Sequence, residues 1–498
     1  MTSSRLPVLV GVAQHRWRDL DPITCPDVTV RAAAVARAAA DDTGVGHRAI
    51  SQVDAWVHVV GWEADNPVDL IARTAGARVA NCWSSGSGGE VGVVAANWAA
   101  RAIERGELDS VVVTGGTDYR TRELAQRRAI AYASPTGGTG SCDVLVKGKP
   151  ASTEIEQAHG MAMPISVYPI FENALRAKRG SSIIEHRRRM GALMSSFTTV
   201  AAANRYAWFP EPRSADDLTT ATADNRMIGF PYTKRLNAIL NVDLNAAFVM
   251  MSAERARSLG IAEDRWVYWW GGDSADEQAY FPSIRPDLAA CPSMQCSHRG
   301  ALHEAGVGID DIAMFDFYSC FPVAVEMACA MLGLDEADSR RFTLTGGLPY
   351  AGGPGSAYTL HSLAAMVERI RAEPAARALV TGNGMFLTKH AASVWSGRPK
   401  PDRFAGTPPE RGTSLPQHAV EVAHEPTGHA TIDGYTVMHD RTGTPERGIV
   451  VGRLDDSRRF VANIFDTAAL HALEEREGVG RTGHVRRGEG VTNLFDLT

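Results

Sequence analysis

The segment from Thr343 to Arg371, TLTGGLPYAGGPGSAYTLHSLAAMVERIR, limits the possible folds of this chain more than any other. Five glycines and two prolines fall between Gly346 and Gly355, and apolar residues then recur at helical spacing. We therefore predict a Gly-rich turn that leads into a helix N-terminus. Free N–H groups and the positive end of the helix dipole suit an anion or a developing oxyanion there, although a tight turn without a ligand has the same pattern.

A second Gly-rich turn, SSGSGGEVGVVAAN at Ser84 to Asn97, also precedes a helical pattern. Strand and helix patterns alternate around both turns, and the segments of the second half match those of the first loosely. This alternation predicts an α/β protein with a parallel sheet covered on both faces. The two turns then predict a site built between duplicated units.

Changes in composition divide the chain into five parts. A long, mostly helical stretch rich in arginine interrupts the α/β pattern, and a segment rich in proline, glycine and charge precedes a final set of short strand patterns. We predict a small, closed or nearly closed antiparallel β-barrel at the C-terminus. The predicted parts are a first half at 1–116, an insertion at 117–236, a second half at 237–395, a linker at 396–416 and the barrel at 417–498.

The length of 498 residues requires more than one core, and the net charge of −6 gives no reason to expect a nucleic acid partner. No apolar run approaches the roughly 20 residues that span a bilayer, and no signal peptide is expected. Seven scattered cysteines fit reduced thiols, so we expect a cytoplasmic protein. Cys291, Cys296 and His298 do not have the spacing of a metal site, and no metal is predicted.

Several long motifs resemble the thiolase superfamily, and within it the thiolase-like protein type 1 group. These motifs are VVAANWAARAIERGELDSVVVTGG, ISVYPIFENALRA, NRMIGFPYTK, FDFYSCFPVAVEMA, LTGGLPYAGGPGSAYTLH, LVTGNGMFLTKH and TPERGIVVGRL. The resemblance covers essentially the whole chain. It implies the five-layered αβαβα thiolase fold, made of two duplicated halves with a loop insertion, and an extra OB-like β-barrel at the C-terminus.

The resemblance also shows which catalytic groups of a thiolase this sequence lacks. The nucleophilic cysteine corresponds to Gly89 in an ungapped count, while Cys82 falls on the preceding strand and Ser85 is nearer only with gaps. The histidine of the G-H-P motif corresponds to Gly353, and the second catalytic cysteine corresponds to Val380. We therefore expect no thiolysis or Claisen condensation through an acyl-cysteine.

Other residues on the turns that line the expected cavity remain candidates. Tyr318 corresponds to the loop aimed at the reacting carbonyl and is the preferred acid or base, with Cys320 and His361 as further catalytic candidates. The alternative is that these side chains only fill space. The candidates for substrate binding are Gly88, Gly89, Ser319, Gly352, Gly353, Asn383, Gly384 and His390.

A run of basic residues in the insertion has two interpretations. By its position in the thiolase fold it would contact the diphosphate of coenzyme A, but a solvated helix face explains it as well. The run consists of Arg176, Lys178, Arg179, Arg187, Arg188 and Arg189.

Three functions follow as hypotheses. The first is a thiolase-like protein that binds acyl-CoA thioesters in lipid metabolism, as a monomer or homodimer, with coenzyme A thioester as its ligand and no permanently bound cofactor. The second is a retro-aldol lyase on β-hydroxyacyl-CoA, because some thiolase-fold proteins without the cysteine do this with tyrosines and a partner of barrel type. The third is a non-catalytic scaffold that binds acyl-CoA.

Overall fold

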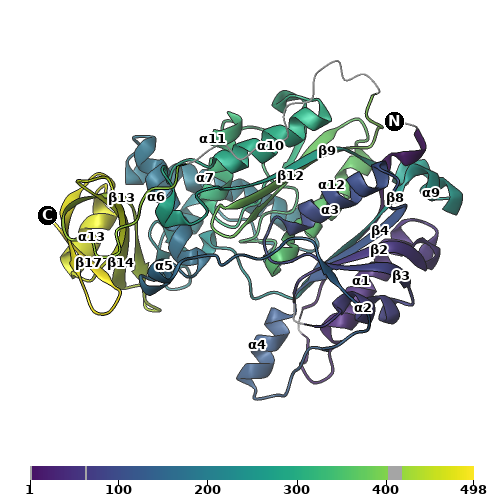
Figure 1. Cartoon of the computed structure of the whole chain (residues 1–498), viewed down its shortest axis with the longest axis horizontal. Coiled ribbons are helices and arrows are strands. Elements are labelled where there is room, and N and C mark those ends of the chain that lie inside the picture. Colours follow the sequence, from purple (N-terminus) through teal and green to yellow (C-terminus); the bar gives the residue numbers. More distant parts are fainter. Residues whose placement is uncertain (1–2, 19, 62–63, 402–417) are drawn as a thin grey trace.

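Two halves that share the order of four strands form the centre of the molecule (Figure 1). The structure is a computed structural model that describes residues 3–18, 20–61, 64–401 and 418–498. In the first half the order is β3-β2-β4-β8-β1, and in the second it is β10-β11-β12-β9. The strands are β1 (Pro7–Arg16), β2 (Gln52–Val59), β3 (Arg78–Ser84), β4 (Ser110–Gly116), β8 (Leu244–Ser252), β9 (Val267–Asp276), β10 (Met314–Asp316), β11 (Arg377–Gly384) and β12 (Lys389–Ser396).

Pairing directions repeat between the halves, as a duplication requires. Both β2–β4 and β10–β11 are parallel, whereas β4–β8, β8–β1, β11–β12 and β12–β9 are antiparallel. The expectation of a parallel sheet was therefore wrong for the strands nearest the junction of the halves. A short antiparallel pairing of β1 with β9 joins the halves into one sheet of ten strands, which β5 (Asp143–Val144) completes at the far edge.

Five layers result because both faces of each half-sheet are covered. Helices α3 (Val91–Glu104) and α12 (Tyr358–Ala372) lie between the two half-sheets and share one apolar core with their inner faces. On β4, Val111 and Val113 face this inner core, while Val112 faces the outer one. The outer helices are α1 (Val28–Asp42) and α2 (Pro67–Ala75) on the first half, and α10 (Pro292–Ala305) and α11 (Pro322–Leu332) on the second.

The insertion packs on this core through its longest helices. Residues of α6 and α7 belong to the same apolar core as α10 and α11, so the described part of the insertion packs into the core of the halves. Its elements are α4 (Tyr119–Arg127), α5 (Glu154–Ala158), α6 (Pro164–Lys178), α7 (Ile183–Ala203), α8 (Ala215–Thr219), β6 (Met227–Gly229) and β7 (Tyr232–Thr233). Helix α9 (Ala253–Leu259) follows β8, and none of the described helices is long and apolar enough to cross a membrane.

The C-terminal strands close into a barrel in the order β13-β14-β15-β17-β16-β13. All its neighbouring strands pair antiparallel except β15 and β17, which are parallel. Along the chain, α13 (Thr467–Glu475) lies between β15 and β16, the third and fourth strands of the barrel in sequence. This is the arrangement of an OB fold, a five-stranded Greek-key barrel. The strands are β13 (Gly428–His439), β14 (Pro445–Leu454), β15 (Arg459–Ile464), β16 (Thr482–Arg487) and β17 (Asn493–Leu497).

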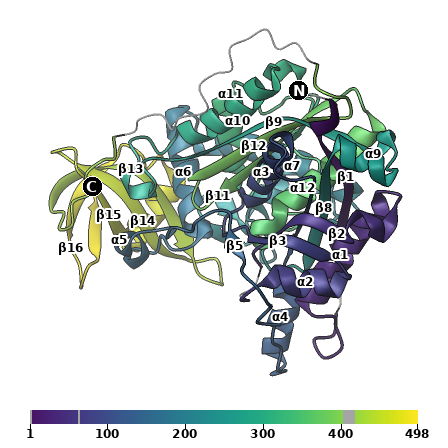
Figure 2. The same cartoon turned by 45° about the vertical axis from the view of Figure 1, so that its right-hand side comes forward.

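The barrel lies at one end of the molecule against the insertion, as both views show (Figures 1 and 2). Gly229 of β6 pairs with Met438 of β13, and Phe230 belongs to the barrel's apolar core. Buried Arg176 of α6 donates to Glu477 at 2.9 Å and to the hydroxyl of Tyr435 at 3.0 Å. The predicted linker lies mostly outside the described residues, apart from 396–401.

Three residues of the basic run make structural contacts. Besides Arg176, Arg179 of α6 forms ion pairs with Glu326 and Glu336, and Arg189 of α7 lies 3.3 Å from Glu336. These residues fix the insertion to α11 and to the barrel. Neither earlier interpretation, diphosphate contact or solvated face, describes Arg176 and Arg179.

Candidate active site

A cavity of about 520 Å³ lies where the two halves and the insertion meet. The first Gly-rich turn contributes Ser87 to its wall, and the second contributes Gly355 and Ser356. The N–H of Gly88 donates to the hydroxyl of Ser356 at 3.1 Å, so the two turns touch. A cavity between the duplicated halves is therefore present, and its lining includes five of the residues predicted for the site: Gly88, Gly89, Tyr318, Cys320 and Asn383.

Tyr318 fills the space beside Gly89, where the resemblance places the nucleophile of a thiolase. A Cβ at position 89 would lie 2.2 Å from the Tyr318 hydroxyl oxygen and 2.4 Å from the backbone oxygen of Asn383. No side chain fits there while Tyr318 holds this position. Burial raises the pKa of the Tyr318 hydroxyl well above its ordinary value, so the group is a proton donor at neutral pH rather than a base.

A polar group missed by the sequence analysis lies beside Tyr318. Tyr168 of α6 donates to the backbone oxygen of Met385 at 2.9 Å and accepts from the Asn383 amide at 3.0 Å. The same amide lies 3.8 Å from the sulfur of Cys320. Burial raises the pKa of Cys320 to about 12, so its thiol stays protonated at neutral pH and is a weak nucleophile.

Glu90, directly after the first Gly-rich turn, was also missed. Its carboxylate is 4% exposed, lies 3.9 Å from the ammonium of Lys389, and has no hydrogen-bond partner among the described residues. A Cβ at Gly384 would lie 1.8 Å from its Oε2, so that glycine makes room for this carboxylate rather than for a ligand. Burial raises the pKa of Glu90 to about 7, although the charge of Lys389 opposes the shift. An acidic residue at a helix start was the signal available in the sequence.

His361 does not reach the cavity lining. It is buried in α12, and its Nδ1 lies 2.9 Å from Oε1 of Gln14 on β1. Burial lowers its pKa to about 3, so the ring is neutral at physiological pH. The structure therefore separates His361 from the other two catalytic candidates, Tyr318 and Cys320.

Four predicted substrate-binding residues besides Gly384 also lie outside the lining. Ser319 is fully buried, and His390 is buried with its Nε2 3.1 Å from the sulfur of Cys291. Gly352 has φ of +105°, and its Cβ would lie 2.8 Å from Leu244. Gly353 donates its N–H to the backbone oxygen of Ile239 at 2.8 Å, and its φ is not left-handed.

Glu172, His186 and Glu326 form a group of possible metal ligands in the part of the chain that the structure describes. They already bind one another and their neighbours: Nε2 of His186 lies 2.5 Å from Glu172, whose other oxygen accepts from Tyr232, and Arg179 pairs with Glu326. Burial raises the pKa of both carboxyls, Glu172 to about 7 and Glu326 well above its ordinary value. The group therefore joins α6, α7 and α11 as a hydrogen-bonded network.

Comparison with known proteins supports these observations. A family model, the thiolase-like protein type 1 additional C-terminal domain, matches residues 414–490. The structure of a monomeric SCP2-thiolase like protein type 1 from Mycobacterium smegmatis is similar, with a TM-score of 0.85, 33% identity and coverage of 100% of both chains. No curated protein sequence matches the chain.

Two more distant structures share the fold. The Ltp2-ChsH2(DUF35) aldolase has a TM-score of 0.61 at 17% identity, covering 79% of this chain and 98% of that one. Acetyl-CoA acetyltransferase from Syntrophomonas wolfei has a TM-score of 0.56 at 17% identity, covering 79% and 99%. The layers, the duplicated halves and the central cavity thus define a thiolase-fold protein with an added barrel. Identity of 33% over the full length shows more: the chain belongs to the thiolase-like protein type 1 family.

Proposed function

We propose that this protein binds acyl-CoA thioesters in the cavity between its two halves, without forming an acyl-cysteine. The observation that carries the proposal is that the Tyr318 side chain occupies the space beside Gly89, which the side chain of a nucleophile would need. The cavity keeps two touching Gly-rich turns at helix starts, which suit a thioester carbonyl. The nucleophile is absent, because Gly89 has no side chain and burial keeps the Cys320 thiol protonated.

Binding and acyl transfer are tested separately. Acetyl-CoA titrated into the full chain in a calorimeter should bind, and the Ser87→Trp variant, which places a bulky ring at an exposed position of the cavity wall, should bind at least about tenfold more weakly. Mass spectrometry after incubation with acetyl-CoA should find no acetyl group on Cys82 or Cys320, and acetoacetyl-CoA turnover should equal background. An acetylated cysteine would show that an acyl-enzyme does form. No detectable binding of acetyl-CoA would refute the proposal that acyl-CoA is the ligand.

A second candidate, retro-aldol cleavage of a β-hydroxyacyl-CoA, is favoured by the Tyr318 hydroxyl. Cleavage of the carbon–carbon bond releases the proton of the β-hydroxyl as the carbonyl fragment forms, and it leaves the thioester as an enolate that takes up one proton. Burial keeps the Tyr318 hydroxyl protonated and the residue lines the cavity, so it would donate a proton to the enolate and recover the one that the β-hydroxyl releases. Product analysis with a β-hydroxyacyl-CoA should then show two fragments with the wild type and loss of activity in Tyr318→Phe. Tyr350→Phe is the matched control, because Tyr350 is buried outside the cavity lining.

If acyl-CoA binds and neither reaction occurs, the non-catalytic scaffold is the remaining function. We propose in each case a cytoplasmic monomer acting in lipid metabolism. The proposal of a monomer is supported by the Mycobacterium smegmatis relative, which is described as monomeric. Sedimentation analysis of the full chain tests the assembly state.

A further inference from the structure

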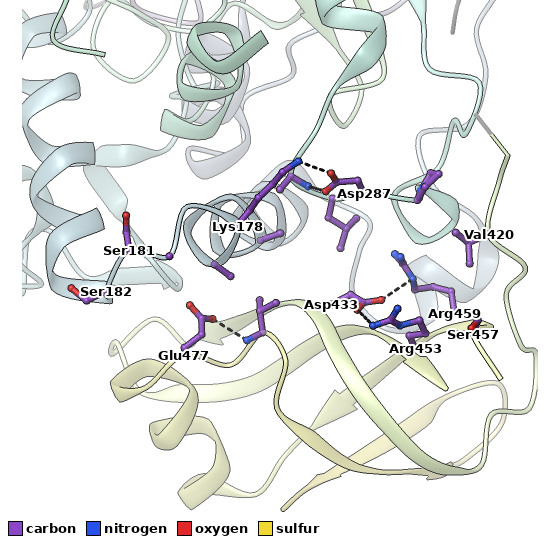
Figure 3. Close-up of a pocket in the computed structure, with 17 residues that line it drawn as sticks. Lys178, Ser181, Ser182, Asp287, Val420, Asp433, Arg453, Ser457, Arg459 and Glu477 are labelled. Carbon is purple, nitrogen blue, oxygen red and sulfur yellow. Dashed lines mark hydrogen bonds and ion pairs between the residues drawn. The ribbon is translucent and has the colours of Figure 1, made fainter. Parts of the chain in front are cut away.

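A second cavity, of about 960 Å³, lies between the barrel and the C-terminal end of α6 (Figure 3). Lys178 and Asp287 lie on one side and pair with each other at 2.7 Å. The barrel contributes Asp433, Arg453 and Arg459 on the other side. Among the described residues, this cavity and the site between the halves have separate linings.

Arg459 of β15 has N–H donors in this cavity that make no hydrogen bond to the described residues. Its side chain is 4% exposed, and Nε lies 3.3 Å from Oδ2 of Asp433. Neither Nε nor Nη1 has a hydrogen-bond partner among the described residues. A buried guanidinium carries five donors, and leaving several of them unpaired is costly. An anion that accepts hydrogen bonds from the unpaired donors of the guanidinium removes this cost.

Arg459 and Arg453 share one carboxylate, Asp433, among the described residues. Asp433 faces two guanidinium groups, since Nη2 of Arg453 lies 3.5 Å from its Oδ1. Lys178 and Asp287 balance each other, and Glu477 is paired with Arg176. A single carboxylate or phosphate placed beside the two arginines would therefore balance the local charge.

The remaining wall of the cavity is apolar. It includes Ala174, Ala177, Leu288 and Val479, and cavities of this size hold ligands much larger than a simple ion. We propose that this cavity binds a small amphipathic anion, whose carboxylate or phosphate contacts Arg459 and Arg453 and whose hydrocarbon part lies on the α6 side. The barrel then contributes half of a ligand site that is separate from the site between the halves.

Calorimetric titration of the full chain with octanoate, octyl phosphate and octyltrimethylammonium tests the proposal. At least one of the two anions should bind, and the cation of equal chain length should not. Arg459→Gln should weaken anion binding at least about tenfold, because it removes charge-assisted hydrogen bonds, and the half-exposed Arg453→Gln should weaken it about threefold. Arg486→Gln is the matched control, since Arg486 is a barrel arginine that pairs with Asp496 and does not line the cavity.

Arg459 is buried, so its variant needs a check of folding. Arg459→Lys keeps the charge and should retain part of the anion affinity, and Arg453→Gln tests the site from an exposed position. Equal binding of the cation, the same affinity in wild type and Arg453→Gln, or no binding of either anion would overturn the proposal. Acetyl-CoA binding should be unchanged in Arg453→Gln, so failure of this site and failure of the proposed function give different results.

Discussion

Gly89→Ala is the most direct test of how the central site is built. The change adds one methyl group where the Tyr318 hydroxyl oxygen lies 2.2 Å away and the Asn383 backbone oxygen lies 2.4 Å away. Gly89 does not have a left-handed φ, so the cost comes from steric overlap and not from backbone strain. The tyrosine ring can turn away, but the carbonyl belongs to β11 and moves only with the strand.

Overpacking of a dense core costs about 1–3 kcal/mol, and contacts this short place Gly89→Ala near 3 kcal/mol. With an unfolding entropy of about 2.1 cal/mol/K per residue, a unit of roughly 400 residues loses roughly 3–4 °C in Tm for that cost. In a Tyr318→Ala background the tyrosine overlap is gone and only the carbonyl overlap remains. We therefore expect the cost of Gly89→Ala to fall by about 1–2 kcal/mol in that background.

Differential scanning fluorimetry of the wild type, Gly89→Ala, Tyr318→Ala and the double variant measures the coupling between the two positions. Gly148→Ala serves as the control, because a Cβ there meets nothing within 4 Å and its φ is not left-handed. The control should change the free energy of unfolding by less than about 0.5 kcal/mol. A Tm of Gly89→Ala within 1 °C of the wild type, or the same loss in both backgrounds, would show that Tyr318 does not occupy this space.

Three further outcomes are expected. Gly352→Ala should lower the Tm more than Gly353→Ala, since only Gly352 combines a φ of +105° with a 2.8 Å contact; equal losses in thermal melts would contradict this. Because the pKa of Glu90 rises from an ordinary 4.5 to about 7 on folding, its contribution to stability is present below pH 4.5 and lost as the pH rises through 7. Urea unfolding between pH 4.5 and 8 should therefore lose stability less steeply in Glu90→Gln, and parallel curves would exclude the shift. Arg176→Ala should destabilise the contact between α6 and the barrel by about 3 kcal/mol in urea unfolding, whereas Lys178→Ala, in an exposed pair, should cost less than about 1 kcal/mol; similar costs would show that the buried contacts of Arg176 are unimportant.

Local patterns in the sequence predicted much of the fold. The apolar spacing from Leu360 to Ile370 does form α12 in the inner core, and the alternating runs after 417 do form barrel strands. Strand β12 was missed because it begins with Lys389 and His390, whose burial depends on partners far away in the chain. Strand β8 lies beyond residue 237 in the chain but pairs with β1 and β4 of the first half, a long-range pairing that no local pattern predicts.

The candidate site was predictable only as far as the turns. Gly88, Gly89, Tyr318, Cys320 and Asn383 follow from the Gly-rich motifs and the loop after β10. The places of Tyr168 and Glu90 depend on tertiary packing: α6 contributes three residues to the cavity wall, Tyr168 among them, and two glycines, Gly88 and Gly384, leave room for the Glu90 carboxylate. Apart from the acidic residue at a helix start, no local sequence pattern marks either arrangement.

Contacts between the insertion and the barrel also affect how the chain is made. The Asn173 amide donates to the backbone oxygen of Tyr435, which is synthesised 262 residues later. At roughly 5–20 residues per second, a ribosome needs on the order of 10–50 s to cover that distance. During this interval Phe230 and the buried polar face of α6 have no barrel to cover them. Newly made chains should therefore depend on chaperones until the last strand emerges, and truncation within the barrel should leave an aggregation-prone product rather than a smaller working protein.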